Sequence, residues 1–205
     1  MPAFDFQDGK GPVPAHQHPN GGGWVADTAT VADTAYIGCD AHVFDNAQVF
    51  GNAQVHGNAK VLQSAWIFGN AQVFRNAQVF GNAQVFGNAQ VFGNAQVFGN
   101  AQVFGNVEVC ESTKIYGNAC AYGNAKIYGN AQICGITKIC GSAKIYGNAQ
   151  FFINVKLDGS ESTYLSEQEI VAPTVNKDYP HLCPNCKSPA YVGFVKIDCS
   201  NNCGV

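Results

Sequence analysis

Apolar residues recur at every sixth position over most of this chain. Every sixth residue from Val25 to Leu157 is Val, Ile, Ala, Phe or Leu, without an insertion or a change of phase. A second series, two residues earlier in each unit, holds small residues, mostly Ala, from Ala29 to Val155. Because residues two apart point to the same side of a strand, the small and the large residue of each unit are expected to share one buried face.

The remaining positions of the unit predict how one strand connects to the next. The residue between the small and the large one is usually Gln or Lys, so we expect it to point outward. Gly-Asn follows in most units, as in the full copy Gly-Asn-Ala-Gln-Val-Phe at 69–74, and both residues tolerate the positive φ of a tight turn. Short strands that always turn in the same direction predict a solenoid of parallel strands.

The repeat resembles that of the hexapeptide-repeat family, whose fold is a left-handed parallel β-helix. The resemblance covers residues 24–157 and rests on a large aliphatic residue followed, four positions later, by a small one. The family usually has Gly, Ala, Asp or Glu after the aliphatic residue, whereas most units here have Phe or Tyr. This variant of the unit, with the Gly-Gly-Gly-Trp segment that ends at Trp24, is similar to a subgroup of uncharacterised bacterial and phage repeat proteins. The resemblance implies an all-β fold, a left-handed parallel β-helix of about seven triangular coils.

If three units make one coil, the residues after the aliphatic position form three columns along the corners. We consider two interpretations of these columns. The rings stack on one another and stabilise neighbouring coils, or one or more columns form an interface, since contiguous exposed apolar surface marks association. The family commonly forms trimers with parallel axes, so the resemblance implies a homo-oligomer, with a trimer favoured. The columns contain Phe44, Leu62, Phe80, Phe98 and Tyr116; Phe50, Phe68, Phe86, Phe104 and Tyr122; and His56, Phe74, Phe92, Cys110, Tyr128 and Tyr146.

The two ends of the chain depart from the repeat. Residues 1–23 are rich in Gly and Pro and are expected to form a flexible N-terminal arm. Residues 158–180 are expected to form a cap and a linker, with a short helix over 160–170 that closes the open end of the solenoid. Residues 181–205 have a different composition and form the last predicted domain.

Four cysteines in this last segment have the spacing of a metal site. They form two pairs, C-x2-C and C-x3-C, separated by twelve residues, and the segment resembles a zinc ribbon. Four thiolates supply a closed tetrahedral site for a structural Zn²⁺, which would provide most of the folding energy of so short a segment. Two disulfides are the alternative, but no secretory signal is visible, so we expect zinc and a cytoplasmic location. The predicted ligands are Cys183, Cys186, Cys199 and Cys203.

Composition narrows the remaining function classes. With four Leu, one Met and 12% charged residues, against about 25% in an average domain, the chain cannot form a helix bundle or a coiled coil. No apolar run is long enough for a membrane helix, so no membrane partner is expected. The net charge of −3 gives no general reason to expect nucleic acid. Lysines concentrate in the later coils, however, so weak binding of nucleic acid or an acidic partner through this face and the ribbon is an alternative: Lys114, Lys126, Lys138, Lys144 and Lys156.

Enzymatic function is the other alternative, because the resembled family includes acyltransferases. Those enzymes use a catalytic His and loops that project from the coils, and the repeat here has no interruption between residues 25 and 157. Only His42 and His56 lie in the coils, and they occupy slots that Gln and Phe hold elsewhere. We therefore expect no catalytic and no cofactor-binding residue. The predicted function is a structural or protein-interaction module, in which a rigid oligomerising solenoid carries the zinc ribbon as its recognition element.

Overall fold

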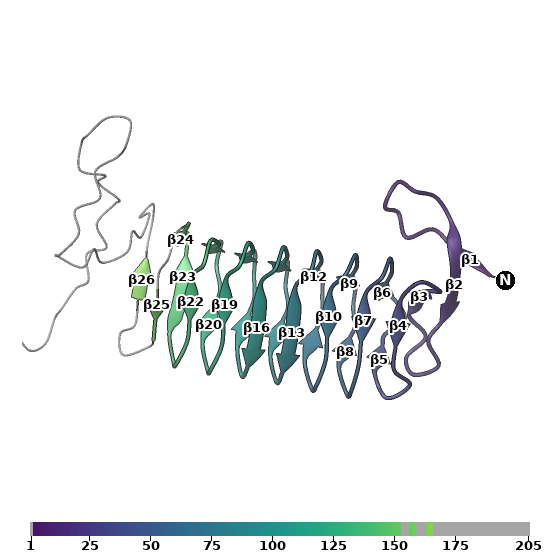
Figure 1. Ribbon diagram of the computed structural model, residues 1–205, viewed down its shortest axis with the longest axis horizontal. Helices are drawn as coiled ribbons and strands as arrows, with labels where there is room; N and C mark the ends of the chain where they lie inside the picture. The colour runs from purple at the N-terminus through teal and green to yellow at the C-terminus, as the bar shows by residue number, and fades with distance from the viewer. Residues whose placement is uncertain (1, 153–155, 159–162, 166–205) are drawn as a thin grey trace, which may run out of the picture.

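The structure is a computed structural model that describes residues 2–152, 156–158 and 163–165. These residues form an all-β parallel solenoid of about seven turns, preceded by an N-terminal segment at one end (Figure 1). The four predicted zinc ligands lie outside the described residues. In the described part of the chain, no helix has the length and apolar character needed to cross a bilayer.

The strands are arranged in three sheets, which we call the first, second and third face. The first face contains β1 (Ala3–Phe4), β2 (Val13–Gln17), β3 (Trp24–Ala26), β6 (His42–Val43), β9 (Lys60–Val61), β12 (Gln78–Val79), β15 (Gln96–Val97), β18 (Lys114–Ile115), β21 (Gln132–Ile133) and β24 (Gln150–Phe151). The second face contains β4 (Thr30–Val31), β7 (Gln48–Val49), β10 (Trp66–Ile67), β13 (Gln84–Gly87), β16 (Gln102–Gly105), β19 (Cys120–Ala121), β22 (Lys138–Ile139) and β25 (Lys156–Leu157). The third face contains β5 (Tyr36–Ile37), β8 (Gln54–Val55), β11 (Gln72–Val73), β14 (Gln90–Val91), β17 (Glu108–Val109), β20 (Lys126–Ile127), β23 (Lys144–Gly147) and β26 (Thr163–Leu165).

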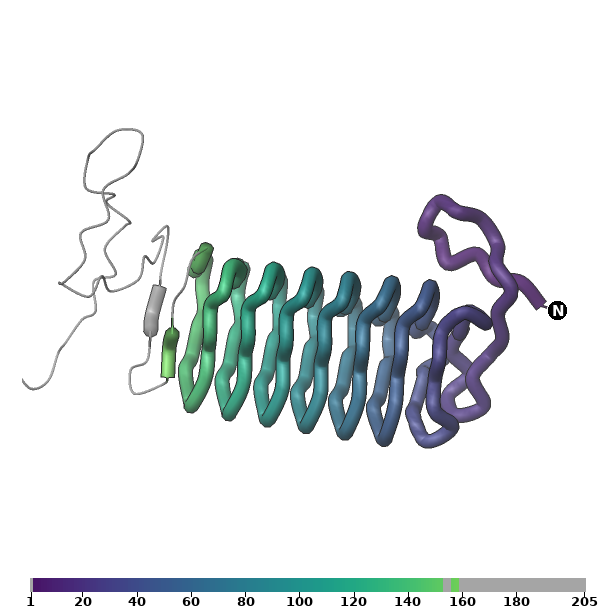
Figure 2. Tube along the Cα trace, in the orientation of Figure 1, coloured from purple at the N-terminus to yellow at the C-terminus, as the bar shows by residue number. Residues whose placement is uncertain are grey.

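The strand register confirms that three six-residue units make one coil. Val25 pairs with Val43, and Val43 pairs with Val61, so each residue lies beside the one eighteen positions later. All pairs from β3 onward are parallel, as a chain that always winds the same way requires (Figure 2). Equal coil length places like residues above one another, so every position of the unit becomes a column along the axis.

The interior of the solenoid is formed by the two predicted apolar columns. Across the central coils, the Ala and Val side chains are fully buried, as at Ala83 and Val85. Two threonines take the small slot and are also buried. The Thr137 hydroxyl donates a hydrogen bond to the carbonyl of Cys134 at 2.7 Å, whereas the Thr113 hydroxyl has no hydrogen-bond partner. The narrow interior accepts a small residue opposite a β-branched one, which explains why the repeat contains so little Leu.

The corners require a positive φ, and Gly usually supplies it. Gly99 has a φ of 69°, and a Cβ there would lie 2.9 Å from the amide nitrogen of Gly117 in the next coil. Gln63 and Glu111 adopt the same conformation without being Gly. The Gln63 side chain accepts a hydrogen bond from the Gly81 amide at 2.8 Å, and that of Glu111 accepts one from the Gly129 amide at 2.8 Å. These acceptors offset the cost of a side chain in the left-handed region.

The N-terminal segment, expected as a flexible arm, contains β1 and β2 and pairs with the solenoid. β1 pairs antiparallel with β2, and β2 pairs antiparallel with β3. Phe4 stacks on Trp24 with ring centroids 4.4 Å apart, and Phe6 stacks on Phe44 at 4.8 Å. We call residues 2–23 the N-terminal cap, because they cover the first edge of the first face. Phe4 and Phe6 lie outside the repeat, so the repeat pattern did not predict these contacts.

At the other end, the helix expected over 160–170 is wrong for the part that the structure describes. Thr163–Leu165 forms β26, which pairs in parallel with β23, Ile145 beside Thr163. The offset is again eighteen residues, so the coil register continues beyond the point where the apolar pattern fades. The unpaired amide and carbonyl groups of β23 favour another strand there, because an open edge is satisfied by strand addition.

Candidate interaction surfaces

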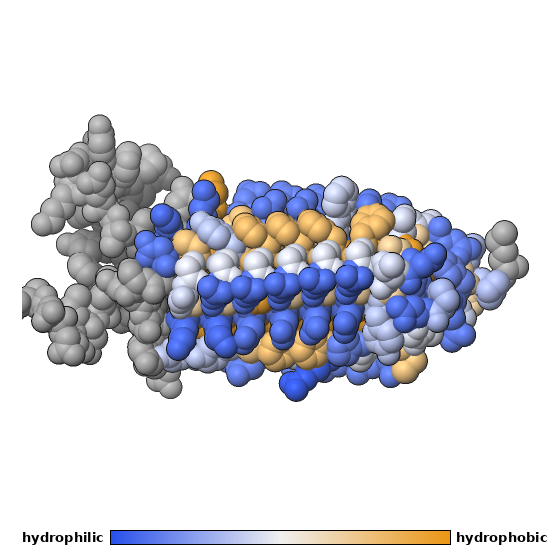
Figure 3. Space-filling model, turned by 90° about the horizontal axis from the view of Figure 1, so that it is seen from below, coloured by the Kyte–Doolittle hydropathy of each residue, from blue (hydrophilic) through white to orange (hydrophobic). Residues whose placement is uncertain are grey.

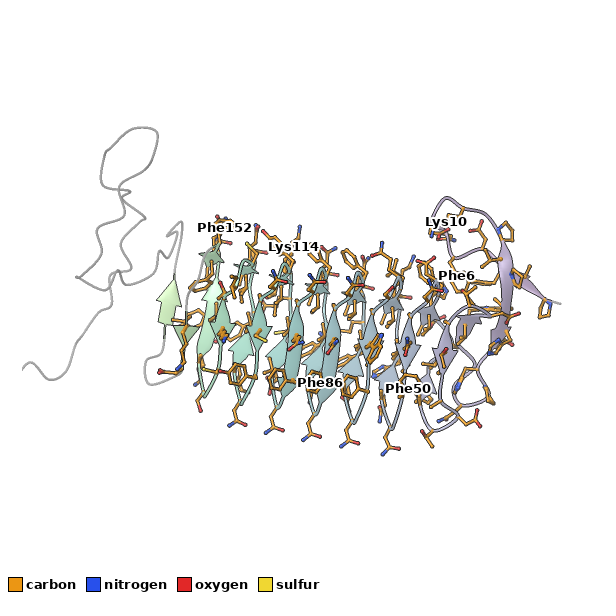
Figure 4. The ribbon with its side chains drawn as sticks, viewed as in Figure 1. Phe6, Lys10, Phe50, Phe86, Lys114 and Phe152 are labelled. Atoms are coloured by element: carbon orange, nitrogen blue, oxygen red, sulfur yellow. The ribbon has the colours of Figure 1, made fainter. Side chains whose placement is uncertain are left out.

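Each face of the solenoid presents two outward columns side by side. In a strand such as β13, Gln84 points outward, Val85 inward and Phe86 outward, so an amide column and an aromatic column share each face. Figure 3 shows the result as hydrophobic and hydrophilic stripes that run along the axis. Phe50 and Phe86 lie along one line parallel to this axis (Figure 4). The structure therefore confirms the columns that the repeat predicts.

The aromatic columns are stacked rings. In the second face, the ring centroids of Phe68 and Phe86 are 4.6 Å apart, those of Phe86 and Phe104 4.7 Å, and those of Phe104 and Tyr122 5.2 Å, with interplanar angles of 6° or less. These distances are close to the spacing of strands in a sheet, so each ring covers its neighbour in the adjacent coil. The self-stacking interpretation is confirmed for these columns. The rings are only partly buried, so their outer edges still form a stripe of accessible apolar surface.

Asparagine side chains form a ladder at each corner. The Asn70 amide donates to Asn88 at 3.1 Å, Asn88 to Asn106 at 3.0 Å, and Asn106 to Asn124 at 2.9 Å. Similar ladders join Asn58 to Asn94 and Asn82 to Asn118 through the residue between them. Each amide thus uses one donor and one acceptor along the axis, and these ladders stabilise neighbouring coils in the same way as the ring stacks.

The two coil histidines lie in aromatic surroundings. His42 contacts Phe4 and Phe6 of the cap edge-on, at 5.1 and 5.6 Å between ring centroids. Its Nδ1 is buried without a hydrogen-bond partner. Burial lowers the pKa of His42 below its usual value, and nearby Lys60 lowers this pKa further. His56 stacks on Phe74 at 5.0 Å, and burial lowers its pKa as well. Both rings therefore contribute packing, His42 against the cap and His56 in the aromatic column of the third face.

The cysteines of the repeat are free thiols at scattered positions. Cys134 and Cys140 are buried, and Cys110 and Cys120 are partly buried. Burial raises the pKa of the Cys110 and Cys120 thiols, which disfavours the nucleophilic thiolate. Within residues 2–152, 156–158 and 163–165, no group of three or more His, Cys, Asp or Glu side chains is placed to hold a metal ion. The predicted zinc site lies beyond this part of the chain.

Charge is distributed unevenly along the axis. Residues 2–45 contain one lysine, Lys10, which pairs with Asp45 at 2.8 Å. Residues 112–157 contain lysines and no acidic residue. The strand order places these lysines on all three faces, so they do not form one basic patch. The acidic residues of the first segment are Asp5, Asp8, Asp27, Asp33, Asp40 and Asp45, and the lysines of the second are Lys114, Lys126, Lys138, Lys144 and Lys156.

Comparison with known proteins adds no assignment to these surfaces. No family model matches the chain, and neither a curated protein nor a solved structure matches it significantly. The class that the fold defines is therefore a parallel β-solenoid with stacked aromatic and amide columns, and its function has to be argued from its own residues.

Proposed function

We propose that this protein is a non-enzymatic structural and protein-interaction module, in which a rigid solenoid associates with other copies and carries a recognition element at its C-terminal end. The observation that supports this proposal is the constant coil length. From β3 to β24, each strand pairs with the strand eighteen residues later, and the coils keep an even outline (Figure 2). Ligand-binding pockets are concave, whereas even coils offer long, flat faces.

Rigidity follows from the columns. Backbone hydrogen bonds, buried Ala and Val, ring stacks and asparagine ladders all connect each coil to the next. Bending the rod at one coil would open all four kinds of contact at once. The left-handed sense of the coils and their membership of the hexapeptide-repeat fold belong to this proposal, on the strength of the repeat pattern. A crystal structure of the full chain tests the handedness directly.

The recognition element in this proposal is the C-terminal segment 181–205, folded as a zinc ribbon. The support is the spacing of Cys183, Cys186, Cys199 and Cys203, which suits a tetrahedral structural Zn²⁺. Zinc-bound thiolates presuppose a reducing compartment, so the cytoplasmic location remains part of the same prediction. Metal analysis of the purified chain should return about one zinc per chain. A content far below one, with intact disulfides by mass spectrometry, would overturn the ribbon.

The function is tested by comparing the partners of the full chain with those of a truncation that ends at residue 180. If the ribbon is the recognition element, partners recovered with the full chain are lost on truncation, while the oligomeric state in light scattering is retained. Calorimetry with acetyl-CoA serves as the counter-test. Specific binding that is lost in His42→Ala or His56→Ala would favour a transferase and contradict the proposal.

A further inference from the structure

We propose that two copies of this chain pair through the second face with their axes antiparallel. The inference rests on the proposed function as an oligomerising rod, and it names the surface, the partner and the orientation. The resemblance to the hexapeptide-repeat family implied a trimer with parallel axes, so the two arrangements make opposite predictions.

The geometry of the pair follows from the coil spacing. A two-fold axis parallel to the strands, midway between β13 and β16, reverses the coil order of the second copy. β10 then faces β19, β7 faces β22, and β4 faces β25. All coils have the same eighteen-residue length, and neighbouring strands are about 4.8 Å apart. When one pair of facing strands is aligned, all the other pairs are therefore aligned as well. The amide column faces the amide column, and the aromatic column faces the aromatic column.

Side-chain size is complementary at two positions of this arrangement. Trp66 is 42% exposed and stands in a slot that Gln holds in β7, β13 and β16. β10, which contains Trp66, faces β19, where the same column holds the short side chain of Cys120. In the aromatic column, Phe50 follows β7 and faces the level of Cys140, which is short and buried. Two large residues in the first half of the face thus meet two short ones in the second half, and symmetry repeats each match.

Charge is complementary as well. The C-terminal end of the second face carries Lys138 in β22 and Lys156 in β25, with Asp158 directly after β25. Among the described residues of this end, two lysines stand against one carboxylate, which is an excess of positive charge. In a parallel pair, the positive end of one copy would face the positive end of the other. This arrangement costs affinity, because like charges repel across an interface.

The N-terminal end of the same face is negative. Asp27 lies in the turn before β4, Asp33 in the turn after it, and Asp45 in the turn before β7. Asp45 already accepts from Lys10, and Asp27 is bonded to His16 at 2.9 Å. Three carboxylates against one lysine still leave a net negative end. In the antiparallel pair, this negative end of one copy faces β22 and β25 of the other copy, so opposite charges attract at both ends of the interface.

On the other two faces the described residues show this complementarity less fully. On the first face, the same operation sets Lys60 in β9 opposite Lys114 in β18, and the cap already covers Trp24 with Phe4. On the third face, Lys126 already pairs with Glu108 at 3.0 Å. Among the described residues, the size match and the charge match therefore occur together on the second face.

The area of the face is sufficient for a stable dimer. Eight strands about 4.8 Å apart span about 34 Å, and a face of five to six residues is about 17 Å wide. The contact is then about 600 Å² per copy, or about 1,200 Å² in total, above the roughly 1,000 Å² that a specific interface needs.

The test measures mass and affinity of the full chain by light scattering and sedimentation. We expect a dimer of twice the chain mass of 21.7 kDa. Lys138→Glu with Lys156→Glu should raise the dimer Kd about tenfold or more, because both ends lose their attraction. Lys114→Glu with Lys144→Glu makes the same charge change on the other faces and should leave the Kd unchanged. Higher ionic strength should weaken the pair.

Trp66→Gln provides a second variant that restores the residue of the repeat and so preserves the coil. It should also weaken the dimer, because the exposed indole is lost. If the Lys138/Lys156 reversal tightens the assembly, or if a trimer forms that neither variant affects, the antiparallel pair is wrong while the oligomerising function stands. A full chain that stays at the monomer mass overturns both.

Discussion

The central coils and the N-terminal cap are stabilised in different ways. In the central coils, every contact is one of a column of equivalent contacts, such as the stack of Phe86 on Phe104 at 4.7 Å. In the cap, each contact occurs once. Phe6 is 2% exposed and packs on Phe44 and His42, from a segment more than thirty residues away in the chain.

This difference determines how each region responds to change. A column distributes the loss of one contact over its neighbours, but it also transmits strain, because a displaced coil disturbs the coils on both sides. In the cap, no equivalent contact replaces one that is lost, so loss of a single buried aromatic contact should detach the segment while the coils remain folded. Four changes, taken in order of decreasing effect, test this difference.

Phe6→Ala should undock the cap at a cost of about 3 kcal/mol, because a fully buried aromatic ring is removed and the cavity cannot be refilled. Hydrogen exchange measures the result: amides of β1 and β2 lose protection, whereas those of β12 to β16 keep theirs. Phe86→Ala is the matched control, since its ring is only partly buried and has neighbours on both sides. Equal loss of protection throughout the chain in Phe6→Ala would show that cap and coils unfold as one unit.

Ala83→Leu should destabilise the central coils by about 2 kcal/mol, because the small slot is fully buried and the extra carbons have no space. Urea unfolding gives the change in free energy. The adjacent outward residue provides the control, because Gln84→Leu should change stability by less than about 0.5 kcal/mol. A similar cost for both substitutions would contradict the assignment of inside and outside.

Gly99→Val and Gly99→Gln should differ although both place a side chain at a φ of 69°. Val should cost about 2 kcal/mol or more, because a β-branched residue is strained there. Gln should cost about 1 kcal/mol less, since its side-chain oxygen can accept a hydrogen bond from the Gly117 amide, as Gln63 does from Gly81. Thermal unfolding of the two variants separates them, and equal midpoints would show that the acceptor contributes nothing.

Acidification should loosen the cap more than the coils. Because burial lowers the pKa of His42 in the folded chain, the unfolded state takes up the proton first, and stability falls as the pH drops below the usual value of 6.5. Hydrogen exchange of β1 and β2 at pH 7.5 and 5.5 measures this effect, and His42→Gln should remove it. His56→Gln is the control, because its ring lies outside the cap contacts. Unchanged pH dependence in His42→Gln would assign the effect to another group.

The sequence predicted much of the fold because the repeat reports the local environment directly. Alternation of Ala, Gln and Val within a unit shows which side chains are buried, and the structure confirms this at Ala95, Gln96 and Val97. The strands outside the repeat were missed for physical reasons. β1 and β2 are held by contacts between distant aromatic rings, and β26 is held by the open edge of β23, neither of which leaves a periodic signal.

The candidate interface shows the same division. The repeat predicted that aromatic and amide columns run along the outside, and it drew attention to the later lysines. The repeat alone does not fix the number of units in a coil; the resemblance implied three, and the strand register confirms this number. With three units per coil, Trp66, Cys120 and Lys138 belong to one face, whereas Lys126 lies on another and is neutralised by Glu108.

The inward and outward positions, the short strands and the turns thus follow from the repeat alone, because they depend only on neighbours within six residues. Where the cap docks, and which charged groups pair across neighbouring coils, are visible only in the folded chain. These properties depend on contacts eighteen or more residues apart, and a local pattern contains no record of which distant residues will meet.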